Sequence, residues 1–201
     1  MNNITPEILL RCHIEDRQET KRKRIKRNFI VFLLIALFVA LVFDLVLVYK
    51  HKKWKEYESM AYVPYTHILI PYRDIKCDLT KAEMRNKLDK LYKIDYTYEE
   101  IDEIEQLVWG YSKDNHIMIC KNVKNGDYIY VLAHEMTHIK YKVCNEIFVE
   151  YKTIITLYES KDKLLQEIAL NRARFIVGGG VATEYDCGYY LLEYFKGEIY
   201  A

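Results

Sequence analysis

Two histidines and a glutamate occur within five residues of one another in the segment VLAHEMTHIKY, residues 131–141. His134 and His138 are four residues apart, so on a helix their imidazoles share one face, about one turn apart. Both rings can then reach a single Zn²⁺ ion at about 2.0–2.1 Å. Glu135 lies roughly 100° round the helix from His134, where its carboxylate can act as a general base toward a water molecule. The spacing therefore predicts a zinc site with hydrolytic chemistry.

A third protein ligand is needed, because a catalytic zinc site takes three protein ligands and leaves the fourth position to water. A helical hairpin that turns near Cys144 sets Glu150 level with His138, beside an apolar stripe, so Glu150 is the expected third ligand. Glu146 lies one turn closer to the loop and is the alternative, in which case Glu150 orients a histidine. Glu167, on a later helix, is the remaining candidate.

The run NHIMIC, a turn and then YIYVLAHEMTHIKY resemble the zincin metallopeptidases, in which an edge strand lies beside the motif helix. The resemblance covers roughly residues 96–160. This segment looks in particular like the small gluzincin-type peptidases of bacteria and phages. The resemblance implies a short sheet packed on the active-site helix and a glutamate of a following helix as third ligand. It also implies that His134 and His138 bind zinc and that Glu135 is the base for hydrolysis of a peptide or protein substrate by a zinc-activated water.

The longer metzincin pattern is absent, because Tyr141 and Cys144 stand where it requires glycine and histidine. Two alternatives to a peptidase use the same residues. One is a non-catalytic, membrane-tethered interaction protein, such as a phage-type envelope factor, with a vestigial HExxH. The other is a domain in which zinc is purely structural.

Residues 28–49 form the apolar run NFIVFLLIALFVALVFDLVLVY, whose one charged residue, Asp44, lies toward its far end. At about 1.5 Å per residue the run spans roughly 33 Å, close to the hydrocarbon thickness of a bilayer. A buried core helix is rarely apolar on all faces for this length. No small-residue cleavage site follows the run, so we predict an uncleaved transmembrane anchor.

The basic residues near the two ends of this run predict its orientation. Residues 13–27 contain seven Lys and Arg, whereas residues 50–64 contain four. The excess places the amino terminus in the cytoplasm and the carboxyl-terminal domain outside it. The basic tail is expected at anionic lipid headgroups. Nucleic acid is not an expected partner, because the net charge of +1 provides no strong field.

The chain is expected to contain four segments: a cytoplasmic tail over 1–27, a transmembrane helix over 28–49, a polar stalk over 50–62 and a zincin-like domain over 63–201. With only 7 Gly and 3 Pro in 201 residues, the composition favours a helix-dominated α+β fold. Four cysteines follow the apolar run, an even number that allows two disulfides or four free thiols. These cysteines are Cys77, Cys120, Cys144 and Cys187.

Two short apolar runs, THILI at 66–70 and NHIMIC at 115–120, predict strands. Backbone groups of NHIMIC could hold an extended peptide as an added strand. His116, on this strand, is expected to be exposed.

Two capping-box patterns predict helix starts in the first half of the domain. Thr80 with Glu83 begins one helix. Thr97 with Glu100 begins a second, which Gly110 is expected to end.

The second half of the domain is expected to be helical. Asp127 is the predicted N-cap of a motif helix over about 128–142, and Asn145 the predicted cap of the next helix. A further helix ends at the glycines 178–180. A last helix is expected to begin near residue 183 and to reach residue 197.

Overall fold

A computed structural model describes residues 6–68, 75, 77–102, 109–196 and 199, with side chains from residue 24 onward except at 54 and 56. The chain forms two compact units, Met1–Trp54 and Lys55–Ala201, which are described separately.

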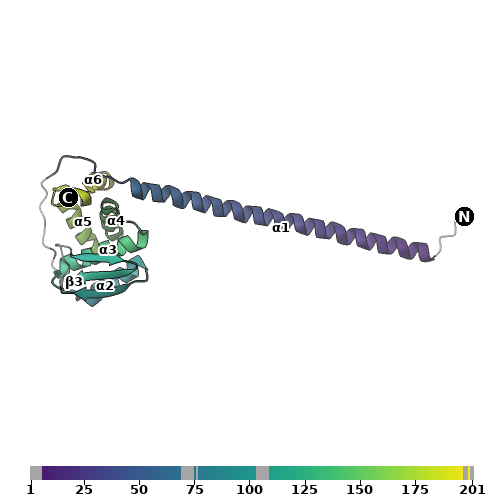
Figure 1. Ribbon diagram of the computed structural model, residues 1–201, viewed down its shortest axis with the longest axis horizontal. Helices are drawn as coiled ribbons and strands as arrows, with labels where there is room; N and C mark the ends of the chain where they lie inside the picture. Colours follow the sequence, from purple (N-terminus) through teal and green to yellow (C-terminus); the bar gives the residue numbers. More distant parts are fainter. Residues whose placement is uncertain (1–5, 69–74, 76, 103–108, 197–198, 200–201) are drawn as a thin grey trace. The chain divides into compact units, whose positions relative to one another are not determined.

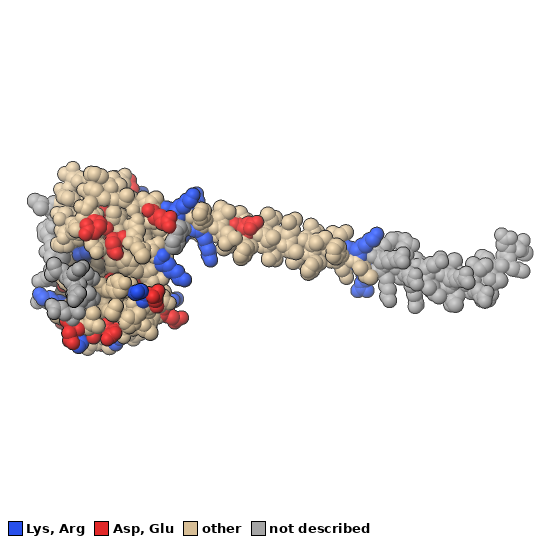
Figure 2. Space-filling view, in the orientation of Figure 1, with Lys and Arg blue, Asp and Glu red and all other residues tan. Residues whose placement is uncertain are grey.

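The first unit consists of the long helix α1 (Pro6–Ser59), whose last residues, from Lys55 on, belong to the second unit. The segment predicted to cross a membrane, residues 28–49, is helical throughout and its large apolar side chains are exposed in this unit. Figure 2 shows this surface, which carries one acidic side chain, between basic side chains at either end. Within the described residues, α1 is the one helix long and apolar enough to cross a bilayer. A helix suits that setting because it satisfies its own backbone polar groups.

The second unit contains a three-stranded sheet of β1 (Thr97–Ile101), β2 (Gly110–Lys113) and β3 (His116–Cys120) in the order β1-β3-β2. β3 runs parallel to β1 and antiparallel to β2. Asp114 and Asn115, with φ of 49° and 64°, make the tight turn of the β2–β3 hairpin. Such positive φ values at both positions suit a two-residue hairpin.

This arrangement corrects two predictions. The segment that begins with Thr97 and Glu100 is strand β1, not a helix, and Gly110 begins β2 rather than ending a helix. The Glu100 carboxylate accepts from Lys81 and Tyr98 instead of closing a capping box. Pairing with β3 thus outweighs the local helix signal. In addition, β3 is the central strand, and the edge strand beside the motif helix is β2.

Six helical elements complete the unit. The motif helix α3 packs against α2, β2 and β3 on one side and against α4 and α5 on the other (Figure 1). Its fully buried side chains join residues of these neighbours in the main hydrophobic core. The elements are α2 (Lys81–Tyr92), α3 (Asn125–Tyr141), α4 (Glu146–Tyr158), α5 (Lys163–Val177), the 3₁₀ turn η1 (Thr183–Tyr185) and α6 (Gly188–Phe195).

Several helix boundaries follow the sequence signals. Thr80 and Glu83 form the predicted capping box, with each side chain accepting from the backbone N–H of the other residue. Asn145 caps α4, and α5 ends at Gly178. Helix α3, however, begins at Asn125, so Asp127 lies in its first turn instead of at the N-cap. A carboxylate in the first turn still interacts favourably with the helix dipole.

Two further predictions differ from the structure. Residues 66–68 form no strand; the Ile68 N–H instead donates to the carbonyl of Val177, and residues 69–70 lie outside the described residues. The predicted last helix is divided into η1 and α6 because Asp186, whose carboxylate accepts from the N–H of Gly188, interrupts it. Of the two cysteine states that the sequence allowed, the structure has the one without disulfides: Cys77, Cys120, Cys144 and Cys187 form none within the described residues.

Candidate metal centre

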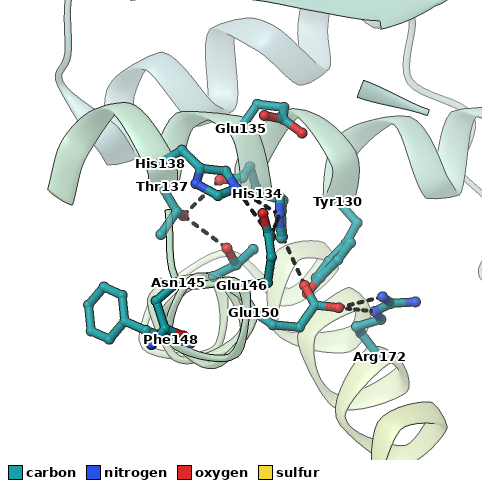
Figure 3. Close-up of polar contacts among 12 residues, drawn as sticks. Tyr130, His134, Glu135, Thr137, His138, Asn145, Glu146, Phe148, Glu150 and Arg172 are labelled. Atoms are coloured by element: carbon teal, nitrogen blue, oxygen red, sulfur yellow. Dashed lines mark hydrogen bonds and ion pairs between the residues drawn. The ribbon is translucent and has the colours of Figure 1, made fainter. Parts of the chain in front are cut away.

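The site lies in the hairpin of α3 and α4, where a short loop brings the two helices face to face (Figure 3). Lys142 adopts the left-handed conformation, with φ of 54°, and its N–H donates to the carbonyl of His138 at 2.8 Å. The Asn145 side chain accepts from the N–H of Phe148 at 3.0 Å and begins α4. Glu146 is therefore the first residue of α4 and lies next to the two motif histidines.

Three potential ligand atoms form a compact triangle. Nε2 of His134 lies 3.2 Å from Nε2 of His138, and a Glu146 carboxylate oxygen lies 3.1 Å from the first and 3.3 Å from the second. Tetrahedral ligation at about 2.0–2.1 Å separates ligand atoms by about 3.3 Å. The triangle thus has the size required to bind one zinc ion. Within the described residues, these three side chains form the one group of His, Cys, Asp or Glu residues that could hold a metal ion.

The opposite ring nitrogens show which atoms carry protons. Nδ1 of His138 lies 2.8 Å from the carbonyl oxygen of Val143, which can only accept. Nδ1 of His134 lies 2.9 Å from a carboxylate oxygen of Glu150. Both Nδ1 atoms therefore donate, and in the neutral rings both Nε2 atoms present lone pairs. Two lone pairs and a carboxylate oxygen meet at one point, so the arrangement needs a cation there.

The pKa values of His134 and Glu146 also indicate that this point favours a positive charge. Burial opposes a charge on His134, but hydrogen bonds with Glu146 and Glu150 raise its pKa to about 10. Burial likewise opposes ionisation of Glu146, whereas the two histidines lower its pKa to about 2. In the absence of a metal, protons supply the positive charge. A divalent cation would take their place and release them.

The Glu150 carboxylate is held as an anion on the far side of His134. Its side chain is 1% exposed. Burial opposes its ionisation, but the Arg172 guanidinium, His134 and Tyr130 together lower its pKa to about 2. Arg172 donates from Nε at 3.0 Å and also from Nη2, and the Tyr130 hydroxyl donates at 2.6 Å. A carboxylate on Nδ1 sets the orientation of a metal-binding imidazole and increases its basicity.

The structure thus assigns the acidic candidates different positions from those expected. Glu146, the alternative, lies at the Nε2 atoms, while Glu150 lies at Nδ1 of His134. Glu167 is exposed on α5. The turn over Lys142–Asn145 is centred near Cys144, as expected, but the packing of α4 on α3 brings the first residue of α4, rather than Glu150, to the Nε2 atoms. Glu146 is therefore level with both histidines and Glu150 one turn further on.

A buried polar chain joins three helices behind the motif. The Thr137 hydroxyl donates to the carbonyl of Ala133 at 2.8 Å and accepts from Thr153 of α4 at 2.9 Å. The hydroxyl of Tyr92, on α2, lies 2.9 Å from the same oxygen. These contacts hold α3 between α2 and α4 and fix the rotation that turns the histidines toward Glu146.

Glu135 faces β2 and is only 6% exposed. The Ser112 hydroxyl of β2 donates to its carboxylate at 2.7 Å. The close approach of β2 to α3 depends on Gly110, because a Cβ there would lie 2.6 Å from Cγ1 of Val131 and 3.3 Å from Cγ of Glu135. The carboxylate thus lies between the motif helix and the edge strand, and it points away from Glu146 (Figure 3).

A tyrosine from η1 lies on the remaining side. The ring of Tyr185 is 6.5 Å from that of His134, centroid to centroid. Burial, together with the charge of Glu146 and other carboxylates, raises the pKa of its hydroxyl. The tyrosine is therefore a neutral donor near neutral pH.

Sequence reasoning missed Tyr130, Ser112, Gly110 and Arg172. Tyr130 is one helical turn before His134, so its place on the same face of α3 was available from spacing. Arg172 is brought in by the packing of α5 on α4, and no local pattern indicates that contact.

Comparison of the chain with family models, with curated proteins and with solved structures finds no match.

Proposed function

We propose that this protein is a membrane-anchored zinc metallopeptidase. The observation that carries the proposal is the triangle of His134, His138 and Glu146, in which three lone-pair-bearing atoms meet at spacings of 3.1–3.3 Å. The donor set of two imidazoles and one carboxylate is that of hydrolytic zinc sites. The side chains of His134, His138 and Glu146 are 13%, 15% and 31% exposed, which leaves a path for water and substrate.

When bound, a zinc ion lowers the pKa of a water molecule and polarises a carbonyl group. Side chains of the protein carry out the remaining steps. The Glu135 carboxylate takes the proton from the attacking water and passes it to the leaving amine. Ser112 keeps that carboxylate in place by donating to one oxygen, which leaves the other oxygen for the proton. Tyr185, a neutral donor on the far side, suits the negative charge that develops on the carbonyl oxygen.

An extended peptide is the substrate that this geometry suits best. β2 is at the end of the sheet, with β3 on one side only. Its other edge is next to the Glu135 side of α3 and can pair with a peptide backbone. β3 cannot take that role, contrary to the expectation for NHIMIC, because β1 and β2 occupy both its edges.

The bilayer is the second proposed partner. The apolar part of α1 supplies the anchor, and the excess of basic residues before it favours a cytoplasmic amino terminus. The metal centre is then outside the cytoplasm.

Metal analysis of the full chain in detergent tests the proposal. We expect one zinc per chain, loss of zinc in His134→Ala and in His138→Ala, and retention in His116→Ala, which removes a histidine of β3 instead. Glu135→Gln should keep zinc but lose cleavage of a pool of unstructured peptides, measured as new amino termini. Wild-type protein without zinc would support a vestigial motif. Zinc without cleavage that depends on Glu135 would support a structural metal.

A further inference from the structure

The end of α1 and the residues that follow it pack on the α3–α4 turn, which directly precedes Glu146. All the residues concerned belong to the second unit. The ring of Tyr57 lies 4.2 Å from that of Phe148 and 5.6 Å from that of Tyr141, centroid to centroid. Together with Val143, these rings and Met60 form a small hydrophobic cluster distinct from the main core. The cluster therefore includes residues on both sides of the α3–α4 turn, from Tyr141 to Phe148.

One side chain links this segment to the start of α4. The Asn145 amide donates to the carbonyls of Tyr57 at 3.3 Å and Met60 at 2.8 Å. Its oxygen accepts from the N–H of Phe148, which is the N-cap bond of α4. The same residue therefore secures the segment and begins the helix at Glu146. Loss of the segment would leave this amide and the apolar face of Phe148 without their partners.

A second contact reaches the other side of the metal centre. The Tyr65 hydroxyl lies 2.9 Å from the carboxylate of Asp186 and 2.9 Å from the carbonyl oxygen of Ile176. Asp186 directly follows Tyr185, the tyrosine near His134. Gly188 is required for this contact, because a Cβ there would lie 2.0 Å from the Tyr65 hydroxyl. The segment thus touches both loops that border the site.

We propose that the segment 57–65, through Tyr57, Met60 and Tyr65, is a structural brace of the metal centre, so that the affinity for metal depends on the attachment of the domain to its anchor segment. Tyr57 and Asn145 hold the turn that presents Glu146, and Tyr65 holds the turn that presents Tyr185. A domain released by cleavage within the brace would bind its metal more weakly. The metal consequence rests on the proposed function, whereas the brace itself does not.

Hydrogen exchange of the full chain, freed of metal with a chelator, tests the brace. We expect Tyr57→Ala to speed exchange of the backbone amides of 143–149 about tenfold, while those of α2 keep their wild-type rates. Tyr62→Ala is the matched control, since Tyr62 is 38% exposed in the same segment. Unchanged exchange at 143–149, equal effects in both variants or a uniform increase across the domain would each overturn the brace.

A second variant separates the brace from helix capping. Asn145→Asp keeps an N-cap acceptor for Phe148 but has no amide to donate to Tyr57 and Met60. It should reproduce the local acceleration seen with Tyr57→Ala. Wild-type exchange in Asn145→Asp would assign the effect of Asn145 to capping alone and contradict the brace.

Competition with a chromophoric chelator measures the metal consequence. Tyr57→Ala should bind Zn²⁺ about tenfold more weakly than wild type, a loss typical of residues that hold metal ligands in position. The affinity of Tyr62→Ala should stay within about twofold of wild type. Equal affinity in all three proteins would refute the coupling to metal. Wild-type protein that binds no zinc would instead refute the proposed function, and the exchange measurement would still decide the brace.

Discussion

At the scale of single residues, the two glutamates of α4 have different contacts: Glu146 lies at the Nε2 atoms of both motif histidines, and Glu150 lies at Nδ1 of His134. The positions of His134, Glu135 and His138 depend only on helical periodicity, which the sequence displays. The start of α4 at Asn145 was predicted, so the choice between Glu146 and Glu150 depends on how α4 packs on α3. The left-handed conformation of Lys142 turns the chain from α3 toward α4, and no local residue pattern predicted it. Spacing thus proved sufficient within a helix and insufficient across a loop.

The two acidic residues should differ in their effects on zinc binding. Glu146→Gln removes a ligand and should weaken zinc by more than the ~10–100-fold that loss of a supporting residue costs. Glu150→Gln keeps the triangle and should stay within that range. It should also lower the thermal midpoint, because the Arg172 guanidinium loses its ionic partner. Glu167→Gln, at an exposed position of α5, is the control. Chelator competition on the three variants checks the order, and a greater loss in Glu150→Gln than in Glu146→Gln would reverse the assignment.

At the scale of elements, the helices with strong local signals were predicted and the sheet was only partly predicted. α2 and α4 begin at caps that satisfy their own backbone groups, so the local sequence was sufficient. β1 carries a capping-box pattern, yet it is a strand because β3 offers a parallel partner for every one of its residues. β2 has one outward-facing edge and four residues, too few for a periodic pattern. Tertiary pairing decided both strands.

The packing of β2 on the motif helix should depend on Gly110. Gly110→Ala places a Cβ 2.6 Å from Cγ1 of Val131, which must push the strand away from Glu135. We expect a loss of about 1–3 kcal/mol in the free energy of unfolding. Val131→Ala should recover part of this loss in the double variant, because it removes the methyl group that the new Cβ meets. Denaturant unfolding of the two single variants and the double variant gives the coupling free energy. Additive losses would show that this contact does not hold the strand.

At the scale of the whole molecule, the division into an apolar helix and a domain was visible in the sequence. The helix has exposed apolar side chains over residues 28–49, whereas the domain buries a core of its own. The first composition is typical of a segment in lipid and the second of a domain in water. The brace was not visible, because the polar stretch around Tyr57 resembles an ordinary solvated stalk. Its aromatic ring has a partner only because the α3–α4 turn presents Phe148.

The orientation of the chain should follow its flanking charges, and their removal should reverse it. Residues 13–27 carry seven Lys and Arg against four in residues 50–64. Replacing Arg22, Lys23, Arg24, Lys26 and Arg27 by Gln leaves two against four, so the bias changes sign. A reporter fused after Ala201, active only outside the cytoplasm, should be active in the wild type and lose most of its activity in the variant. A control that replaces the same number of Lys and Arg residues within 81–124, far from the span, should leave the reporter active, because only charges near the ends of the span set topology. A cytoplasmic reporter in the wild type would place the metal centre in the cytoplasm and remove the basis for an extracytoplasmic peptidase.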